Sequence, residues 1–403
     1  MLEAQATADA SSLPSTRYVS GAPPGSVHTD PDSTGPLISN NNNNSNNNDN
    51  NSNSHSNNSN SSTGGISGLN SLSSFRADVQ TGGAAEPVVS PPQHPPPLFH
   101  LAELLQQASG DSSSIELPRV RIIDVGAMLL GESEDVWRPL LRRGHCESVV
   151  GFEPCPEECD RLNANAPSSV SAGCGQASPS GSSQCSFRFL PWALGDGSTG
   201  QFRRCSAAMT SSMLEPNIPL LRRFVQLEEV TTVVERSEMQ TRRLDDLLPE
   251  IPGGGADFLK LDVQGYELAV LKGAVAALKE VLVVHTEVEF VEMYERQPLF
   301  AEVDQFMRSA GFVFHRFMSL HGRPMKPLHL VSNPLQPISQ QLWADAVYVR
   351  DLWELEGYSG EQLLRLALIL HEVYHSYDVV LHVLQKYDAG IAKQYLERVL
   401  KCQ

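Results

Sequence analysis

Three short apolar segments of this chain each end with an acidic residue, and each is followed by a segment with helical spacing. They are VRIIDVGA (120–127), SVVGFEP (148–154) and DFLKLDVQG (257–265). Apolar strands that alternate with helices predict parallel βαβ units. In such sheets, ligands bind beyond the carboxyl ends of the strands. The sequence therefore predicts an α/β domain that carries Asp124, Glu153 and Asp262 at one ligand-binding edge.

The regions on either side of this pattern differ from it in composition. Residues 1–96 contain a run of almost pure Asn and Ser and a Pro-rich segment. Such segments bury too little apolar surface to offset chain entropy, so we expect a disordered arm. Residues 97–351 carry the strands and helices, and residues 352–403 show the period of a helical appendage.

Charge and cysteine content argue against several classes of function. The chain has 30 Lys and Arg against 47 Asp and Glu, and an acidic chain without a basic stripe is a poor nucleic-acid binder. No segment reaches the ~20 consecutive apolar residues of a membrane span. The N-terminus lacks a secretory signal, and the scattered cysteines show no zinc spacing, so no metal site is predicted. We expect a reduced, cytoplasmic protein, with organelle targeting as the alternative.

The same periodicities predict the other elements of the domain. After Gly265 a helix is expected, with Leu268, Leu271, Val275 and Leu278 on one apolar face. Further strands are expected at 187–196, 200–206, 228–241, 281–290, 312–317 and 344–351, helices at 134–144, 156–166, 244–250 and 301–311, and a loop at 170–184. The strand at 344–351 is expected to close the sheet.

The glycine pattern after the first strand helps to distinguish between a nicotinamide dinucleotide and S-adenosylmethionine as the cofactor. Gly126 permits a tight turn and a close approach of the backbone to a ligand, and Glu153 is placed to accept hydrogen bonds from both ribose hydroxyls. DVGAMLLGE lacks the G-x-G-x-x-G pattern that seats a pyrophosphate, and Glu132 and Glu134 would repel one. A cationic sulfonium suits an acidic pocket, so these residues favour S-adenosylmethionine over a nicotinamide dinucleotide.

Four segments, in this order, resemble the FkbM-type family of S-adenosylmethionine-dependent methyltransferases: IIDVGA (122–127), GFEP (151–154), ALGD (193–196) and FLKLDVQGYELAVLKGA (258–274). The last is the most specific. The resemblance implies the class I methyltransferase fold, a Rossmann-like, mostly parallel seven-stranded sheet with helices on both faces. It also implies methylation of a hydroxyl on a sugar or small molecule. The family often has Asn and a further Gly after DVGA, where this chain has Met128-Leu-Leu-Gly131.

The resemblance also implies roles for single residues in binding the cofactor. Asp124, Gly126 and Ala127 would face its methionine moiety. Glu153 would hold the ribose, and Asp196 would bind the adenine amino group. All of these roles depend on the match of each residue to the family's motifs.

Methyl transfer is an in-line displacement, so alignment of the reactants supplies much of the acceleration. A hydroxyl acceptor must also lose a proton, which requires a base or a metal. Asp262, beside the methyl-donor end, is the first candidate for positioning the acceptor or taking its proton, and Lys260 is the second. Glu287 and His285 on the next strand are further candidates. Lys260 has a structural alternative, the neutralisation of a carboxylate on an adjacent strand.

Two other functions fit parts of the pattern. The first is an NAD(P)-linked oxidoreductase on a Rossmann sheet, which would need the pyrophosphate-binding glycines that this chain lacks. The second is a catalytically inactive, methyltransferase-like scaffold that associates through the Asn-rich arm and the helical tail. The three acidic residues at the strand ends argue against the scaffold, so the preferred prediction is an S-adenosylmethionine-dependent O-methyltransferase.

Overall fold

The computed structural model describes residues 97–108, 117–128, 135–166 and 185–402, all of which fall in a single compact unit. The predicted arm (1–96), the predicted loop (170–184) and residues 129–131 of the divergent segment lie outside the described residues. The boundaries of the three predicted regions therefore stay predictions.

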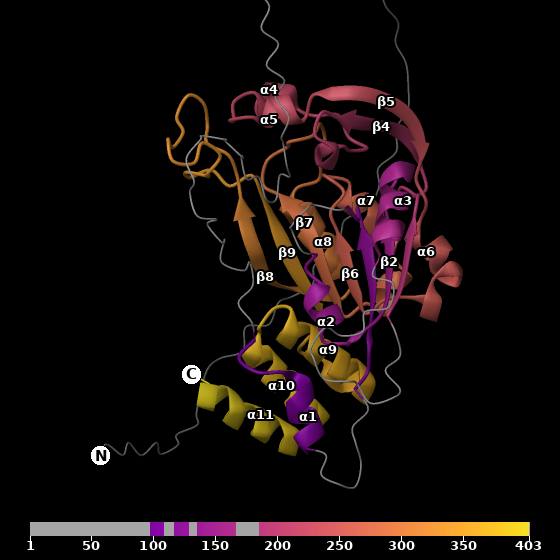
Figure 1. The fold of residues 1–403 in the computed structure, drawn as a ribbon, viewed down its shortest axis with the longest axis vertical. Coiled ribbons are helices and arrows are strands. Elements are labelled where there is room, and N and C mark those ends of the chain that lie inside the picture. The colour runs from indigo at the N-terminus through magenta and orange to yellow at the C-terminus, as the bar shows by residue number, and fades with distance from the viewer. Residues whose placement is uncertain (1–96, 109–116, 129–134, 167–184, 403) are drawn as a thin grey trace, which may run out of the picture. The chain divides into compact units, whose positions relative to one another are not determined.

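A seven-stranded sheet forms the centre of this unit (Figure 1). In spatial order the strands are β3 (Ser186–Leu190), β2 (Cys146–Phe152), β1 (Val120–Val125), β6 (Phe258–Leu261), β7 (Val283–Glu289), β9 (Trp343–Arg350) and β8 (Phe312–His321). The first five pair in parallel, and β9 is antiparallel to both of its neighbours. This mostly parallel sheet confirms the predicted fold class. The strand β9 inserts between β7 and β8, whereas an edge strand would have closed the sheet from outside.

Helices cover both faces of the sheet because successive strand residues point to opposite sides. On β1, Ile122 faces one hydrophobic core and Ile123 faces the other. The first core is covered by α1 (Leu101–Ala108), α2 (Arg138–Arg142), α9 (Gly360–Glu372), α10 (Tyr377–Tyr387) and α11 (Ala389–Cys402). The second is covered by α6 (Leu244–Leu247), α7 (Glu267–Lys272) and α8 (Phe300–Ser309), while α3 (Pro156–Asn165) packs against β3.

A small layer covers the ends of the strands where the cavity described below opens. It contains a separate two-stranded sheet of β4 (Thr199–Cys205) and β5 (Val233–Gln240), together with α4 (Ile218–Leu221) and α5 (Leu227–Val230), at the top of Figure 1. The strand predicted at 228–241 is thus wrong in its first residues, which form α5. Leu227 and Val230 of this helix pack in a third hydrophobic core instead.

The helix predicted after Gly265 is shorter than its apolar stripe indicated. α7 ends at Lys272, and Gly273 follows it, packed so closely that an added Cβ would lie 2.0 Å from the backbone oxygen of Gly195. The carbonyl of Gly273 accepts a hydrogen bond from the N–H of Asp245 at 3.0 Å, outside the helix. The next turn is the 3₁₀ helix η5 (Ala277–Lys279). The carboxylate of Asp245 accepts hydrogen bonds from the N–H groups of Ala276 and Ala277 at its start. The kink turns Val275 outward, where it is 50% exposed, so its predicted place in the stripe is wrong.

A buried acidic residue joins the C-terminal helices to α1, a helix that the sequence analysis did not predict. Glu372 on α9 is 1% exposed and accepts a hydrogen bond from the backbone N–H of Leu101 at 3.1 Å. It also forms an ion pair with Arg143, just after α2, at 2.7 Å. The neighbouring His371 contacts the carbonyl of Phe99 at 2.7 Å. Hydrogen bonds and an ion pair thus connect residues near the beginning of the described chain to α9 near its end.

Glu372→Ala is expected to lower the free energy of unfolding by about 3 kcal/mol, because it leaves Arg143 and a buried N–H without their acceptor. Glu361→Ala, on the same helix, is the control, because the Glu361 side chain is 61% exposed and its ion pair contributes little. Urea unfolding of both variants measures the difference. Equal losses in the two variants would show that Glu372 does not anchor α1.

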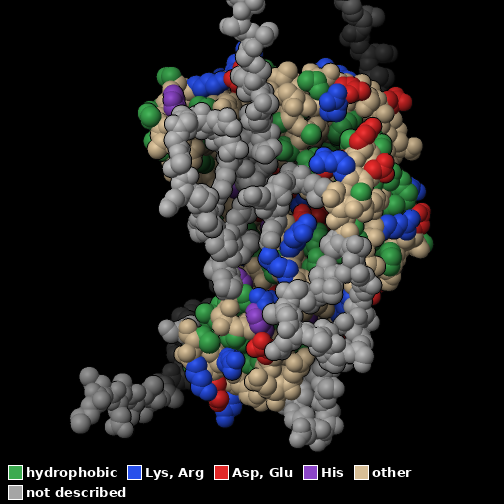
Figure 2. Space-filling model, in the orientation of Figure 1, with side chains coloured by type: hydrophobic (Ala, Val, Ile, Leu, Met, Phe, Trp, Pro, Cys, Tyr) green, Lys and Arg blue, Asp and Glu red, His purple; other side chains and the backbone are tan. Residues whose placement is uncertain are grey.

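Charged side chains are spread over the described surface. On the face shown in Figure 2, Lys and Arg side chains lie among acidic and apolar ones and do not gather in one continuous stripe. Within the described ranges, no helix is both long enough and apolar enough to cross a membrane.

Candidate functional site

A cavity opens at the carboxyl ends of β1, β2 and β6. It has ≈ 980 Å³ of empty space, which includes its opening to solvent. Gly126 follows β1, Glu153 follows β2 and Asp262 follows β6, and all three line this cavity. Residues of the segment 208–213, from the small layer, line it from the other side. The parallel strands therefore bring together three of the predicted site residues that lie up to 136 positions apart in the sequence.

Asp124 and Lys260 lie beside each other, in register, on β1 and β6. Asp124 is 1% exposed, accepts a hydrogen bond from the indole N–H of Trp137 at 2.9 Å, and pairs with the Lys260 ammonium at 3.1 Å. Burial alone would lower the pKa of Lys260, but the carboxylates of Asp124 and Asp262 outweigh burial and raise it. Lys260 lines the cavity as a charged group and also donates to the carbonyl of Gly126 at 3.4 Å, whereas Asp124 lies behind it.

The turn after β1 leaves room only for glycine. Gly126 has φ of 77°, and a Cβ added there would lie 1.9 Å from the backbone oxygen of Asp262. Its N–H and that of Ala127 both donate to the carbonyl of Phe152, at 2.9 and 3.2 Å. The side chain of Ala127 is buried against Phe189, so the structure does not place it on the main cavity.

Glu153 stands where β2 gives way to α3. Its side chain is 5% exposed, and one carboxylate oxygen accepts a hydrogen bond from the N–H of Cys155 at 2.8 Å. Burial raises the pKa of Glu153 to about 7. The hydrogen bond holds the carboxylate in one orientation at the rim.

Asp196 is not brought to the cavity. It is exposed in the turn after β3, where its carboxylate accepts a hydrogen bond from the N–H of Ser198 at 3.0 Å. The side chain of Ser198, and then its N–H, lower the pKa of Asp196. The cavity is lined instead by residues that precede Asp196 in the same segment, namely Trp192, Ala193 and Leu194. The strand predicted at 187–196 ends at Leu190, so the last residues of ALGD curve away from the sheet.

Gln264 connects the polar groups at the floor of the cavity, and the sequence analysis did not single it out. Its side-chain N–H groups donate to Asp262 at 3.0 Å and to Glu287 at 2.8 Å. Its side-chain oxygen accepts from the hydroxyl of Tyr294 at 3.2 Å. The only advance signal was its place between Asp262 and Gly265 in the most specific motif. Its φ of 55° is unusual for a non-glycine residue, as expected where surrounding contacts hold a strained backbone.

Of the further base candidates, Glu287 lines the cavity and His285 does not. His285 is 7% exposed, contacts the hydroxyl of Tyr374 at 3.2 Å and lies 3.8 Å from the carboxylate of Asp345. Asp135, which the sequence analysis left out, also lines the cavity, and burial raises its pKa.

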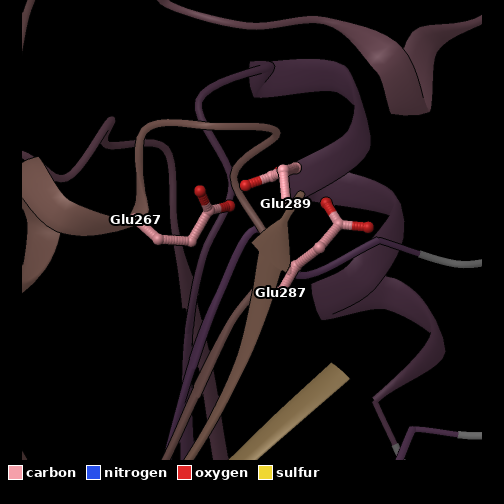
Figure 3. A group of neighbouring side chains, drawn as sticks. All are labelled: Glu267, Glu287 and Glu289. Carbon is pink, nitrogen blue, oxygen red and sulfur yellow. The ribbon is translucent and has the colours of Figure 1, made fainter. Parts of the chain in front are cut away.

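Three buried glutamates form a group beside this floor, as Figure 3 shows: Glu267 at the start of α7, and Glu287 and Glu289 on β7. Oxygen atoms of the three lie within 4.8 Å of one another. Glu267 accepts a hydrogen bond from the N–H of Val263 at 2.8 Å, as expected for a residue in the first helical turn, but one oxygen of Glu289 is buried without a partner. Within the described residues, none of the three forms an ion pair.

Burial sets the protonation of this group. It raises the pKa of Glu267 to about 7, and those of Glu287 and Glu289 well above their ordinary value. The folded protein therefore holds protons that the unfolded chain releases above about pH 4.5. Proton binding by these glutamates therefore contributes to the free energy of unfolding. This contribution is complete below about pH 4.5 and is lost as the pH rises through 7 and beyond.

Glu289→Gln is expected to raise the free energy of unfolding at pH 8 by about 1–3 kcal/mol, the cost of a buried group without a hydrogen-bond partner, because the glutamine cannot ionise. At pH 5 the variant and the parent protein should differ little, because Glu289 is protonated there in the folded state. Glu292→Gln, an exposed neighbour, is the control. Urea unfolding in the presence of a chelator measures all three proteins, and a less stable Glu289→Gln protein at pH 8 would contradict the assignment.

Part of the chain matches a known protein family. Residues 124–314 match the family model described as the methyltransferase FkbM domain. No curated protein matches the chain.

Three solved structures that match have low TM-scores. The first is a magnesium protoporphyrin IX methyltransferase (ChlM) from Synechocystis PCC 6803 with bound SAM, at 11% identity over 62% of this chain and 78% of that chain, with a TM-score of 0.28. The second is a protein of the NADB-Rossmann superfamily from Streptococcus agalactiae, at 10% identity over 75% of this chain and 97% of that chain, with a TM-score of 0.28. The third is a SAM-dependent methyltransferase from Methanosarcina mazei, at 10% identity over 58% of this chain and 94% of that chain, with a TM-score of 0.24. TM-scores of this size support no conclusion about this chain. The family match does: residues 124–314 correspond to the methyltransferase FkbM domain, a domain of S-adenosylmethionine-dependent methyltransferases.

Proposed function

We propose that this domain transfers the methyl group of S-adenosylmethionine to a hydroxyl group of a small-molecule or carbohydrate acceptor. The observation that supports this most is the meeting of Gly126, Glu153 and Asp262 in one cavity at the carboxyl ends of parallel strands. Ligands of open α/β sheets bind at this edge. A methyltransferase needs both reactants there, side by side.

The residues around the cavity fit S-adenosylmethionine. Four acidic residues line it, Asp135, Glu153, Asp262 and Glu287, against one cation, Lys260, whose charge Asp124 already balances. Such a lining favours a cationic sulfonium and disfavours a pyrophosphate. At Gly126 only backbone borders the cavity, because a Cβ has no space there. When bound, S-adenosylmethionine supplies an electrophilic methyl group.

Each cofactor-binding residue has a role that its contacts support. Glu153 accepts hydrogen bonds from the ribose hydroxyls, since its carboxylate is already oriented by Cys155. Gly126 borders the methionine moiety, and Asp124 acts from behind it by holding Lys260 in place. Trp192 and Leu194 border the adenine in place of Asp196, which stays outside the cavity.

Asp262 positions the acceptor hydroxyl and accepts its proton. Lys260 is an ion-paired ammonium with a raised pKa, so it does not accept a proton at neutral pH and serves as a positioning residue. Burial and the neighbouring carboxylate of Asp262 raise the pKa of Glu287. The amide of Gln264 donates to both carboxyl groups and so fixes the side chain of Asp262.

Calorimetry with S-adenosylhomocysteine, and separately with NAD⁺ and NADP⁺, tests the cofactor. We expect saturable binding of S-adenosylhomocysteine alone, whereas tighter binding of either dinucleotide would favour an oxidoreductase.

Release of S-adenosylhomocysteine from S-adenosylmethionine, measured over a panel of sugars, glycosides, phenols, amines and thiols, tests the acceptor. Turnover with hydroxylated compounds, and a larger loss of turnover than of cofactor affinity in Asp262→Asn, is the expected result. Binding without turnover on any compound would favour the scaffold. A preference for amines would contradict the hydroxyl acceptor.

A further inference from the structure

Two cysteines that are distant in the sequence meet at the amino-terminal ends of β2 and β3. Cys146 begins β2, and Cys185 directly precedes β3, whose Ser186 pairs with Ser148 in parallel register. The two sulfur atoms are 2.9 Å apart although 39 positions separate the residues. In this register Cys185 lies level with Glu147, one residue from Cys146. A spacing of about 4.8 Å between strands and about 3.3 Å along a strand gives a Cα separation of about 6 Å, within the range of about 4.4–6.8 Å that a disulfide accepts. A bond between these sulfurs therefore needs little movement of the backbone.

The surroundings give the two thiols different reactivity. Cys146 is 1% exposed, whereas Cys185 is partly exposed and accessible to a small reagent. The contact with Cys146 lowers the pKa of Cys185, and the guanidinium of Arg119 acts in the same direction. The same contact, together with burial, raises the pKa of Cys146. Because the thiolate is the attacking species, Cys185 is the thiol that reacts first.

We propose that Cys146 and Cys185 form an oxidisable dithiol site, at which a low-molecular-weight disulfide such as oxidised glutathione converts the two thiols into a disulfide that joins β2 to β3. Both residues are free cysteines in this structure. Of the other described cysteines, no pair shows such a contact between sulfur atoms.

The exchange balances in two steps. The Cys185 thiolate attacks one sulfur of oxidised glutathione, forms a mixed disulfide and releases one glutathione thiolate. The sulfur of Cys146 then attacks that of Cys185, forms the internal disulfide and releases the second glutathione thiolate. Two electrons pass from the protein to glutathione, and the two thiol protons reach the released thiolates through solvent.

The disulfide would stabilise an edge of the sheet. β3 is an edge strand, and closing the loop between the two cysteines restricts the unfolded chain. We expect the oxidised protein to melt on the order of 5–10 °C higher than the reduced protein. The site lies at the opposite end of β2 from Glu153, so affinity for S-adenosylhomocysteine should not change. The inference is therefore independent of the proposed function.

The test equilibrates the full chain with oxidised and reduced glutathione at a series of ratios, alkylates the remaining thiols after denaturation, and locates linked peptides by fragmentation mass spectrometry. We expect one internal disulfide, between Cys146 and Cys185, and its absence in Cys185→Ser. Cys205→Ser, which removes another buried thiol, is the matched control and should form the bond as the parent protein does. Tm is then compared for the oxidised and reduced parent protein.

Several results would overturn the proposal. Alkylation of both cysteines after treatment with excess oxidised glutathione would do so, as would a glutathione adduct that persists on Cys185. A bond from either cysteine to a different partner would also refute the pairing. These readouts come from the parent protein, so they hold even if a variant fails to fold. An oxidised protein that melts no higher than the reduced one would refute the stabilising role.

Discussion

Gly126→Ala is expected to lower the free energy of unfolding by about 3 kcal/mol or more and to abolish detectable binding of S-adenosylhomocysteine. A non-glycine residue in the left-handed region costs about 1–3 kcal/mol, and overpacking costs a further 1–3 kcal/mol. Both apply here, because φ is 77° and the added Cβ would lie 1.9 Å from the backbone oxygen of Asp262. A backbone atom cannot turn aside as a side chain can, so the end of β6 must shift and the cavity with it.

Gly144→Ala separates the two causes. Gly144 has nearly the same conformation, with φ of 73°, but an added Cβ there meets nothing within 4 Å. We therefore expect only the conformational cost, about 1 kcal/mol, and unchanged ligand binding. Urea unfolding and calorimetry on both variants provide the measurement. If the two variants lose equal stability, the close approach at Gly126 has no energetic consequence and the tight cavity wall is misassigned.

Glu153→Gln is expected to weaken binding of S-adenosylhomocysteine about 10- to 100-fold at pH 8, since hydrogen bonds to a charged group contribute about 1.5–3 kcal/mol. The glutamine keeps the size of the side chain and an acceptor for the N–H of Cys155. The effect should depend on pH in a definite direction. Because burial raises the pKa of Glu153 to about 7, the free protein carries a neutral carboxyl group below that pH and a carboxylate above it.

Affinity of the parent protein for S-adenosylhomocysteine should therefore increase as the pH rises from 6 to 8, while Glu153→Gln should show no such step. Calorimetry at several pH values measures both curves. Glu157→Gln is the control, because Glu157 is an exposed neighbour in the same segment. A variant at position 153 that binds as tightly as the parent protein at pH 8 would show that Glu153 does not hold the ribose.

The sequence indicated those parts of the site that depend on local pattern. Apolar runs that end in Asp or Glu marked the ends of β1, β2 and β6, and parallel strands must present those ends at one edge. This reasoning placed Glu153 and Asp262 on the same cavity before any contact between them was visible. Local pattern was less successful where packing interrupts an element. Nothing in the period of the helix after Gly265 indicated that it would end at Lys272, before the closely packed Gly273.

Roles that depend on contacts between distant residues could not be predicted from one sequence. Asp124 and Glu153 both end strands, yet Asp124 points into the core toward Trp137 and pairs with Lys260, while Glu153 reaches the cavity. Asp196 has the right place in a motif but lies in a turn that curves away. The bridge made by Gln264 and the meeting of Cys146 with Cys185 each join segments that no local period relates.

Local residue patterns were enough to predict the alternation of strands and helices, the acidic ends of three strands and the lack of a pyrophosphate-binding glycine pattern. Each of these follows from the residue's own chemistry and its nearest neighbours along the chain. The folded arrangement decides which acidic side chain faces the cavity, which one a lysine neutralises and which one has a raised pKa. Those outcomes depend on burial and on atoms within about 4 Å, and strand register brings such atoms together from segments more than a hundred residues apart.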